Sequence, residues 1–112
     1  MLAKVKRLNL KKDFKWVVSG RKIETKYLKL FIREGENNIP RIGIAVSSGL
    51  FKKATQRNRV KRLTSQAFEP IFHLLPPTIN IVALPKVNIH DVKSQDVLLD
   101  LEEKLKDEKI LH

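Results

Sequence analysis

Apolar side chains near the start of the chain recur at the spacing of one helix face. In residues 8–19 these are Leu10, Phe14, Val17 and Val18. The spacing predicts a helix that ends near Gly20, because glycine commonly follows the last helical turn. Trp16 falls off the apolar face of this helix.

Two later segments alternate between their faces, as strands do. Residues 27–33 place Leu28, Leu30 and Ile32 on one face, and on the other Tyr27, Lys29, Phe31 and Arg33. Residues 41–48 repeat the alternation with Ile42, Ile44 and Val46 on one side. The intervening sequence EGENNIP is rich in turn-forming residues, so we expect the two strands to form a hairpin.

A second helix is predicted over residues 54–68, before Pro70, because proline ends or kinks a helix. Its narrow apolar stripe would face the core and consists of Val60, Leu63 and Ala67. A rotation of about 100° per residue turns polar side chains outward, namely Asn58, Lys61, Arg62 and Ser65, with Arg57 and Arg59 on the flanks. Basic residues therefore surround the exposed surface of this helix.

The last third of the chain predicts one strand and one helix. After Pro76 and Pro77, residues 78–85 (TINIVALP) form a short β-branched run that is typical of a buried strand. An amphipathic helix follows, defined by Val97, Leu98, Leu101 and Leu105, with Asp91 or Ser94 as its N-cap. The order is helix, two strands with room for a third, helix, strand, helix. This order indicates an α/β (α+β) fold in a single domain over residues 1–112.

Composition removes several classes of function. The chain has no cysteine, which excludes a disulfide, a thiolate nucleophile and a cysteine-ligated zinc. The histidines His73, His90 and His112 do not have the spacing of metal ligands. No apolar segment is long enough for a secretory signal or a membrane span, so we expect a soluble, cytoplasmic protein.

Charge is distributed unevenly along the chain. Residues 1–90 hold 19 Lys/Arg against 5 Asp/Glu, whereas residues 91–112 hold 4 against 7, and the formal net charge is +11. A basic body with an acidic last helix indicates that one region faces a polyanion and another does not. Nucleic acid is the leading candidate for this partner, ahead of an anionic membrane.

The sequence KKATQRNRVKR, residues 52–62, holds six cationic side chains. Arginine can hold a phosphate through two parallel hydrogen bonds, and cations on three sides of a helix can contact several phosphates at once. Asn58 adds a group that both donates and accepts hydrogen bonds. The segment therefore indicates a grip on an RNA or DNA backbone; a solvated basic helix face is the alternative interpretation.

The polar face of the strand at 27–33 carries a second candidate site. Aromatic rings that alternate with cations suit single-stranded nucleic acid, because bases stack on the rings while cations meet the phosphates. Here the alternating residues are Tyr27, Lys29, Phe31 and Arg33. The alternative is an ordinary amphipathic strand whose rings are half covered by a helix.

Chemistry performed by the protein itself would need a nucleophile, paired carboxylates or a metal cluster. Asp13 and Glu69 are the acids that accompany the first two helices, and the carboxylates after residue 91 mostly occupy the polar face of the last helix. No histidine has an evident acidic partner in the sequence. We therefore expect no catalytic residue in this chain.

Three stretches together resemble the bacterial ribonuclease P protein component: ATQRNRVKR, RLNLKKDF and RIGIAVSS. The resemblance implies a two-layer sandwich with a central mixed sheet, in which the helix carrying the Arg-Asn-Arg signature makes a left-handed βαβ crossover. It also implies a protein subunit that binds a catalytic ribonuclease P RNA and assists the endonucleolytic removal of the 5′ leader from precursor tRNA. The holoenzyme would need Mg²⁺, with no cofactor bound by the protein alone and no membrane or DNA partner.

The resemblance also assigns roles to individual residues. Contacts to the RNA subunit would come from Lys52, Lys53, Arg57, Asn58, Arg59, Lys61 and Arg62, and contacts to the leader from Phe14, Trp16, Val18, Tyr27, Lys29 and Phe31. Val18 departs from the family, which usually has a second aromatic residue there, so either Trp16 replaces that ring or leader stacking is weaker. Metal-binding groups stay unassigned.

Two other functions are compatible with the same charge. One is a ribosomal-type or general RNA-binding protein without a role in tRNA processing. The other is a DNA-binding regulator that reads the major groove through residues 54–68. The regulator is disfavoured because the cations spread around the helix and no helix-turn-helix pattern adjoins it.

Overall fold

A four-stranded mixed sheet forms the centre of the structure, a computed structural model that describes residues 2–111. The strands are β1 (Arg21–Glu24), β2 (Leu28–Glu34), β3 (Arg41–Ile44) and β4 (Ile79–Pro85), in the spatial order β1-β2-β4-β3. Strand β4 is antiparallel to β2 and parallel to β3. Because parallel neighbours cannot be joined by a tight turn, the chain between β3 and β4 crosses over the sheet.

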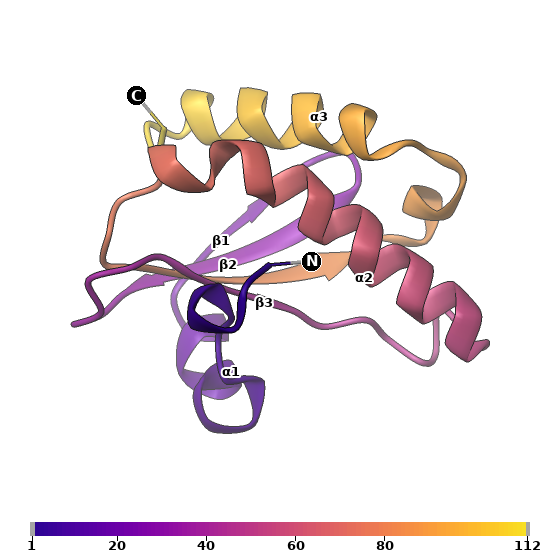
Figure 1. Cartoon of the computed structure of the whole chain (residues 1–112), viewed down its shortest axis with the longest axis horizontal. Helices are drawn as coiled ribbons and strands as arrows, with labels where there is room; N and C mark the ends of the chain where they lie inside the picture. Colours follow the sequence, from indigo (N-terminus) through magenta and orange to yellow (C-terminus); the bar gives the residue numbers. More distant parts are fainter. Residues whose placement is uncertain (1, 112) are drawn as a thin grey trace.

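The helices lie on both faces of the sheet (Figure 1). Helix α2 (Ala54–Phe68), which makes the crossover, and α3 (Ser94–Asp107) cover one face, and the shorter α1 (Leu10–Val18) lies on the other. Short 3₁₀ turns complete the fold as η1 (Lys4–Lys6), η2 (Glu69–Leu74) and η3 (Val87–Asp91). The predicted fold class, a mixed sheet with helices, is confirmed, although α1 on the second face adds a third layer to the expected two-layer sandwich. The handedness of the crossover stays a prediction.

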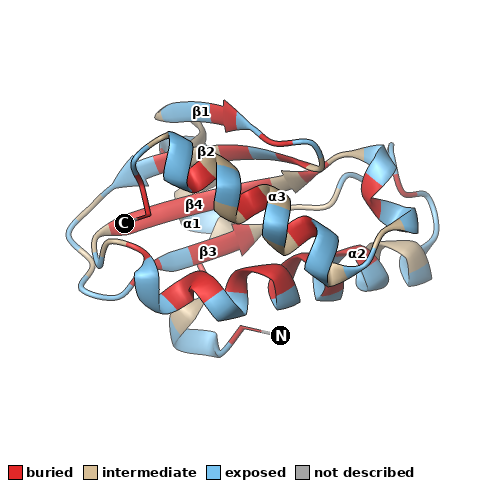
Figure 2. Cartoon of the chain, turned by 90° about the horizontal axis from the view of Figure 1, so that it is seen from above, coloured by how far each residue is buried: buried red, intermediate tan, exposed pale blue. Residues whose placement is uncertain are grey.

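The main core lies between the sheet and the pair α2 and α3, where buried positions face each other (Figure 2). The predicted apolar face of β2, Leu28, Leu30 and Ile32, is buried here. The stripes predicted for the two helices are buried opposite it, with Val60, Leu63 and Ala67 from α2 and Val97, Leu101 and Leu105 from α3. Leu98, the fourth predicted member on α3, is half-buried. Among residues 2–111, none of the helices is long and apolar enough to cross a bilayer.

The predicted hairpin between residues 27–33 and 41–48 is wrong, because β4 lies between β2 and β3. Strand β2 instead pairs with β1, which the hydrophobic pattern missed because only Ile23 of its four residues is buried. Strand β3 is also shorter than predicted and ends at Ile44. The position of β4 in the sheet depends on how α2 packs across the sheet, and no local sequence pattern predicts that packing.

Two further expectations fail at the ends and surfaces of helices. Neither Asp91 nor Ser94 caps α3: the N-cap is Lys93, and its N–H donates to the Asp96 carboxylate at 3.1 Å. Ser65, expected to face outward on α2, is 3% exposed. The N-terminal segment explains this burial, since Leu2 joins the main core beside it.

Gly20 lies too close to the backbone of β2 for a side chain. A Cβ there would lie 2.5 Å from the carbonyl oxygen of Ile32 on β2. We predict that Gly20→Ala lowers the free energy of unfolding by about 1–3 kcal/mol, because the strand must shift to relieve the overlap. Gly49→Ala is the control, because its nearest neighbour would be the Ser47 hydroxyl at 3.4 Å. Urea unfolding that shows equal stability for the two variants would contradict the prediction.

Candidate nucleic-acid interface

The cations of residues 52–62 carry positive charge that no acid offsets. Among residues 2–111, no carboxylate forms an ion pair with Lys52, Lys53 or a cation of α2. The ion pairs of the described chain lie elsewhere, for example Arg21 with Glu108 at 2.6 Å. The positive potential of this helix is therefore directed at solvent.

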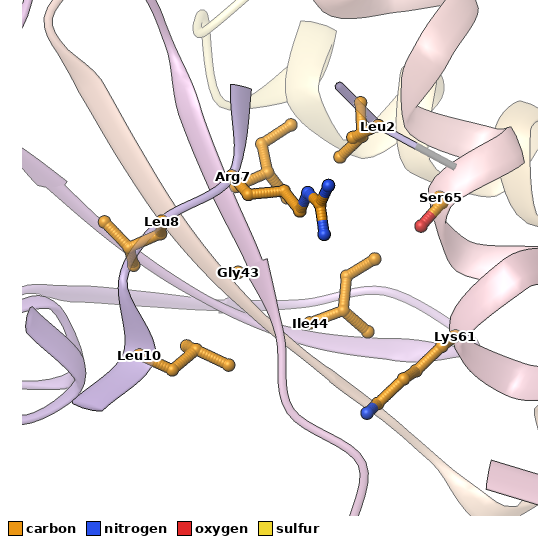
Figure 3. A pocket seen from close by; sticks show the side chains of 9 residues that line it. Leu2, Arg7, Leu8, Leu10, Gly43, Ile44, Lys61 and Ser65 are labelled. Atoms are coloured by element: carbon orange, nitrogen blue, oxygen red, sulfur yellow. The ribbon is translucent and has the colours of Figure 1, made fainter. Parts of the chain in front are cut away.

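These cations are distributed over more than one side of α2. Arg59 and Arg62 line a hollow of about 300 Å³ that reaches the start of α3 at Lys93. Lys61 projects toward the edge of β3, where Arg7 also lies (Figure 3). Lys52, Lys53 and Asn58 are exposed at the N-terminal end of the helix. A bound phosphate backbone can therefore be contacted over a wide arc rather than along a single line.

Arg57 is the exception among the predicted contacts, because the protein itself uses its guanidinium group. The side chain is half-buried, and its Nη1 donates to the carbonyl oxygens of Phe51 at 2.9 Å and Lys52 at 3.0 Å. Phe51 is 3% exposed and belongs to the main core. Arg57 therefore ties the loop before α2 to the helix, and only part of its guanidinium stays available to a ligand.

A second apolar cluster lies between α1 and the opposite face of the sheet, and we call it the α1-face cluster. Its buried members are Leu8, Val17 and Val82, and its half-buried members are Leu10, Phe14, Val18, Phe31, Ala45 and Leu84. Three of the predicted leader-binding residues therefore meet here. Lys29 joins them as an exposed cation on the same face, opposite Leu84 in the register of β2 and β4.

The close approach of α1 to the sheet depends on a missing side chain. A Cβ at Gly43 would lie 2.5 Å from a methyl carbon of Leu10. Leu10 can therefore pack directly on the backbone of β3, which holds the first turn of α1 against the edge of the sheet. The rings of Phe14 and Phe31 stay half-buried beside this contact, with part of each surface accessible.

The structure separates Tyr27 and Trp16 from that cluster. Tyr27 packs against the main core on the other side of the sheet, and its N–H donates to the Asp100 carboxylate of α3 at 3.2 Å. Trp16 is 39% exposed, with the Arg33 guanidinium 5.0 Å from its ring centroid. Arg33 also donates to the Ser19 hydroxyl at 2.7 Å. The ring of Trp16 thus stacks with a cation of this chain, and its role in place of the aromatic absent at Val18 stays a prediction.

Acidic and histidine side chains are dispersed over the described part of the chain. Within residues 2–111, no three His, Cys, Asp or Glu side chains gather in a group that could hold a metal ion. One histidine does have an acidic neighbour, contrary to expectation, since His90 Nε2 lies 3.4 Å from Asp91 Oδ1. Both side chains of this pair are exposed, and His112 lies outside the described residues.

Arg7 is a further cation beside α2, and its sequence pattern predicts no role for it. It borders the same pocket as Lys61, although the two residues are far apart in the chain. Tertiary structure brings Arg7 and Lys61 to the same pocket. Arg7 forms an isolated β-bridge with Ile42 of β3, and the crossover places α2 along that same edge. Its presence in RLNLKKDF was the only signal, and that motif alone does not identify a neighbour.

Comparisons with known proteins agree on one family. The sequence model of the Ribonuclease P family matches residues 2–109. The chain is 36% identical over 84 residues to the ribonuclease P protein component of Legionella pneumophila (strain Lens), which covers 74% of this chain and 71% of that protein. It is 32% identical over 96 residues to the corresponding protein of Clostridioides difficile (strain 630), covering 84% and 83%. The solved structure of the RNase P protein from Thermotoga maritima superposes with a TM-score of 0.79 at 27% identity, over 90% of this chain and 96% of that one.

The two arginines of the Arg-Asn-Arg sequence are predicted to differ in their effect on stability. Arg57→Gln should lower the free energy of unfolding by about 1–2 kcal/mol, because two backbone carbonyls lose a charged donor. Arg59→Gln makes the same change in charge at an exposed side chain that forms no hydrogen bond within residues 2–111, so its melting temperature should equal that of the wild type. Thermal unfolding by circular dichroism measures both, and identical melting temperatures would show that the Arg57 contacts do not stabilise the fold.

Proposed function

Because the chain belongs to the ribonuclease P protein family, we propose that it binds ribonuclease P RNA and the 5′ leader of precursor tRNA. The RNA subunit hydrolyses the phosphodiester bond, and the protein positions the substrate and offsets phosphate repulsion. On one face of the sheet, the cations of α2 without acidic partners support binding of the RNA subunit. On the other face, the half-buried rings of the α1-face cluster support binding of the leader.

Helix α2 is the proposed contact for the RNA subunit. A large folded RNA brings many phosphates together, and each cation that neutralises one releases a condensed counterion. Arg59 and Arg62 are exposed and without ion pairs among residues 2–111, so binding RNA does not first require breaking an internal salt bridge. Arginine in particular can hold phosphate oxygens in pairs.

The α1-face cluster is the proposed contact for the leader. A single-stranded leader presents unstacked bases, whereas the bases of a duplex are stacked on each other and their faces are inaccessible. Phe14 and Phe31 offer accessible ring surface, and Lys29 lies on the same face to meet a phosphate. Mature tRNA lacks the leader, so this face would distinguish the substrate from the product.

Magnesium belongs to the RNA part of this proposal. Divalent ions supply charge screening and activate water in RNA-based phosphodiester hydrolysis, and the holoenzyme would need Mg²⁺ for cleavage. The fixed cations of the protein replace part of the screening role. Maturation of tRNA would place this activity in the cytoplasm.

Leader recognition predicts a selective effect of Phe31. Phe31→Leu keeps an apolar side chain in the α1-face cluster but removes the stacking surface. In the reconstituted holoenzyme it should weaken binding of leader-bearing precursor by about 1–3 kcal/mol and leave mature tRNA unaffected. Tyr27→Leu is the matched control, since Tyr27 packs on the opposite side of the sheet. Equal losses for precursor and mature tRNA would refute leader stacking at Phe31.

The proposed division of labour is tested by cleavage as a function of magnesium. The protein alone should cleave no precursor tRNA. With a bacterial ribonuclease P RNA, it should permit removal of the leader at Mg²⁺ concentrations where the RNA alone is nearly inactive, and the advantage should shrink as Mg²⁺ rises. The double variant Arg59→Gln/Arg62→Gln should require more Mg²⁺ than the wild type.

Lys106→Gln/Lys109→Gln provides the charge-matched control, because it removes two cations from the acidic end of the chain. It should behave like the wild type. Site-specific cleavage by nuclease-free protein without RNA would overturn the proposed function. Failure to stimulate several bacterial RNA subunits would favour a general RNA-binding protein.

A further inference from the structure

A pocket of about 170 Å³ opens at the outer edge of β3, between the start of α1 and the middle of α2 (Figure 3). Leu8 and Leu10 line one side, Lys61 lines the opposite side, and Ile44 lies between them. A cavity of about 150 Å³ accepts a benzene ring in another protein. This β3-edge pocket therefore has room for one aromatic ring against a mostly aliphatic lining.

Backbone N–H and C=O groups of β3 face this pocket without a hydrogen-bond partner in the described residues. The N-terminal segment bonds to β3 at Ile42, whose carbonyl accepts from the Leu8 N–H at 3.1 Å, and the chain then turns into α1. Peptide groups alternate along a strand, so those of Ile44 point outward as those of Ile42 do. In the described residues, no backbone hydrogen bond covers that outward side of Ile44. An edge strand thus offers a donor and an acceptor to a ligand.

Two cations border the pocket, Arg7 from the N-terminal segment and Lys61 from α2. Both are exposed, and neither side chain forms an ion pair or a hydrogen bond within residues 2–111. No carboxylate occurs among the described residues that line the pocket. The complementary ligand therefore combines a flat ring with an anionic group, as a nucleotide does.

The pocket is continuous with the α1-face cluster. Leu8 and Leu10 belong to both. Ile44 and Ala45 are adjacent in the chain but pack on opposite sides, Ala45 against the α1-face cluster and Ile44 against the main core. The pocket therefore lies between the α1-face cluster and α2.

We propose that the β3-edge pocket binds one unpaired nucleotide of the 5′ leader. The base stacks against Leu10 and Ile44 and meets the outward peptide groups of Ile44, while Arg7 and Lys61 hold the adjoining phosphate. This assignment rests on the proposed function and adds a site that lies beyond the aromatic rings. Lys61 accordingly serves the leader, whereas Arg59 and Arg62 on the other flank of α2 serve the RNA subunit.

The leader is the favoured occupant because the pocket requires a free base. A duplex region of the RNA subunit keeps its bases paired and stacked, so it can offer only phosphates to Arg7 and Lys61. The shared side chains Leu8 and Leu10 also place the pocket on the same apolar surface as the leader contacts. The experiment must therefore distinguish binding of the leader in this pocket from a contact between the pocket and the RNA subunit.

The test compares Arg7→Gln with Lys4→Gln in the reconstituted holoenzyme. Both variants remove one positive charge from the N-terminal segment, and both side chains are exposed, but only Arg7 lines the pocket. Affinity is measured for mature tRNA and for precursors whose leaders increase one nucleotide at a time. Arg7→Gln should weaken binding about 3-fold to 10-fold, and only beyond a threshold leader length. The slope of log affinity against log salt should fall by about 0.7 for those precursors, the value for one phosphate of a single strand.

Lys4→Gln should change every affinity by less than about twofold, as expected for an exposed charge without a bound phosphate. Arg7→Gln overturns the assignment if it has no effect at any leader length. It also overturns the assignment if it weakens mature tRNA, or assembly with the RNA subunit, as much as precursor binding. Wild-type protein that shows no preference for any leader would instead refute the proposed function itself.

Crosslinking gives an independent reading that does not depend on a variant. A 4-thiouridine placed in turn at each leader position should crosslink, at one position, to the peptide holding residues 7–10 or the one holding residues 42–46. Flanking positions on one side should crosslink to the peptide that contains Phe14 or Phe31. Crosslinks confined to the aromatic peptides at every position would show that the leader does not enter the β3-edge pocket.

Discussion

The parallel pairing of β3 with β4 is the constraint on which the other features depend. Strands that run in the same direction need a long connection, and here that connection is α2. Helix α2 must then lie across one face of the sheet, which leaves the other face to α1. The cationic helix and the aromatic cluster are thereby held on opposite sides of the sheet. They come together only where the edge of β3 lies between them.

The uneven charge of the chain has a structural counterpart. Carboxylates of α3 hold the turn between β1 and β2, since Asp100 accepts hydrogen bonds from the backbone N–H groups of Lys26 and Tyr27. Glu108 at the end of the same helix pairs with Arg21 of β1. These acids contact residues at β1, which is the edge of the sheet opposite β3. The cations beside β3 are consequently left without acidic partners in the described chain.

The accessibility of the aromatic rings follows from the length of α1. Its nine residues extend over about 14 Å at 1.5 Å per residue. The seven residues of β2 extend over about 23 Å at 3.3 Å per residue. A single short helix therefore covers only part of its face of the sheet, and Phe14, Val18 and Phe31 stay half-buried. The main core has two longer helices, and its residues are nearly all excluded from solvent.

Elements with a local signal could be predicted from the sequence. The 3.6-residue period and Pro70 placed α2 at residues 54–68, and the alternation along β2 predicted which of its side chains are buried. The Arg-Asn-Arg signature indicated the family. The remaining features could not be predicted, because the contacts that produce them join residues far apart in the chain. Strand β4 lies between β2 and β3, so the predicted hairpin does not form. Ser65 is buried where Leu2 of the N-terminal segment joins the main core. Arg57 donates to a carbonyl oxygen of the loop before α2. The position of Arg7 and Lys61 at one pocket likewise required both the N-terminal bridge and the crossover, neither of which has a local pattern.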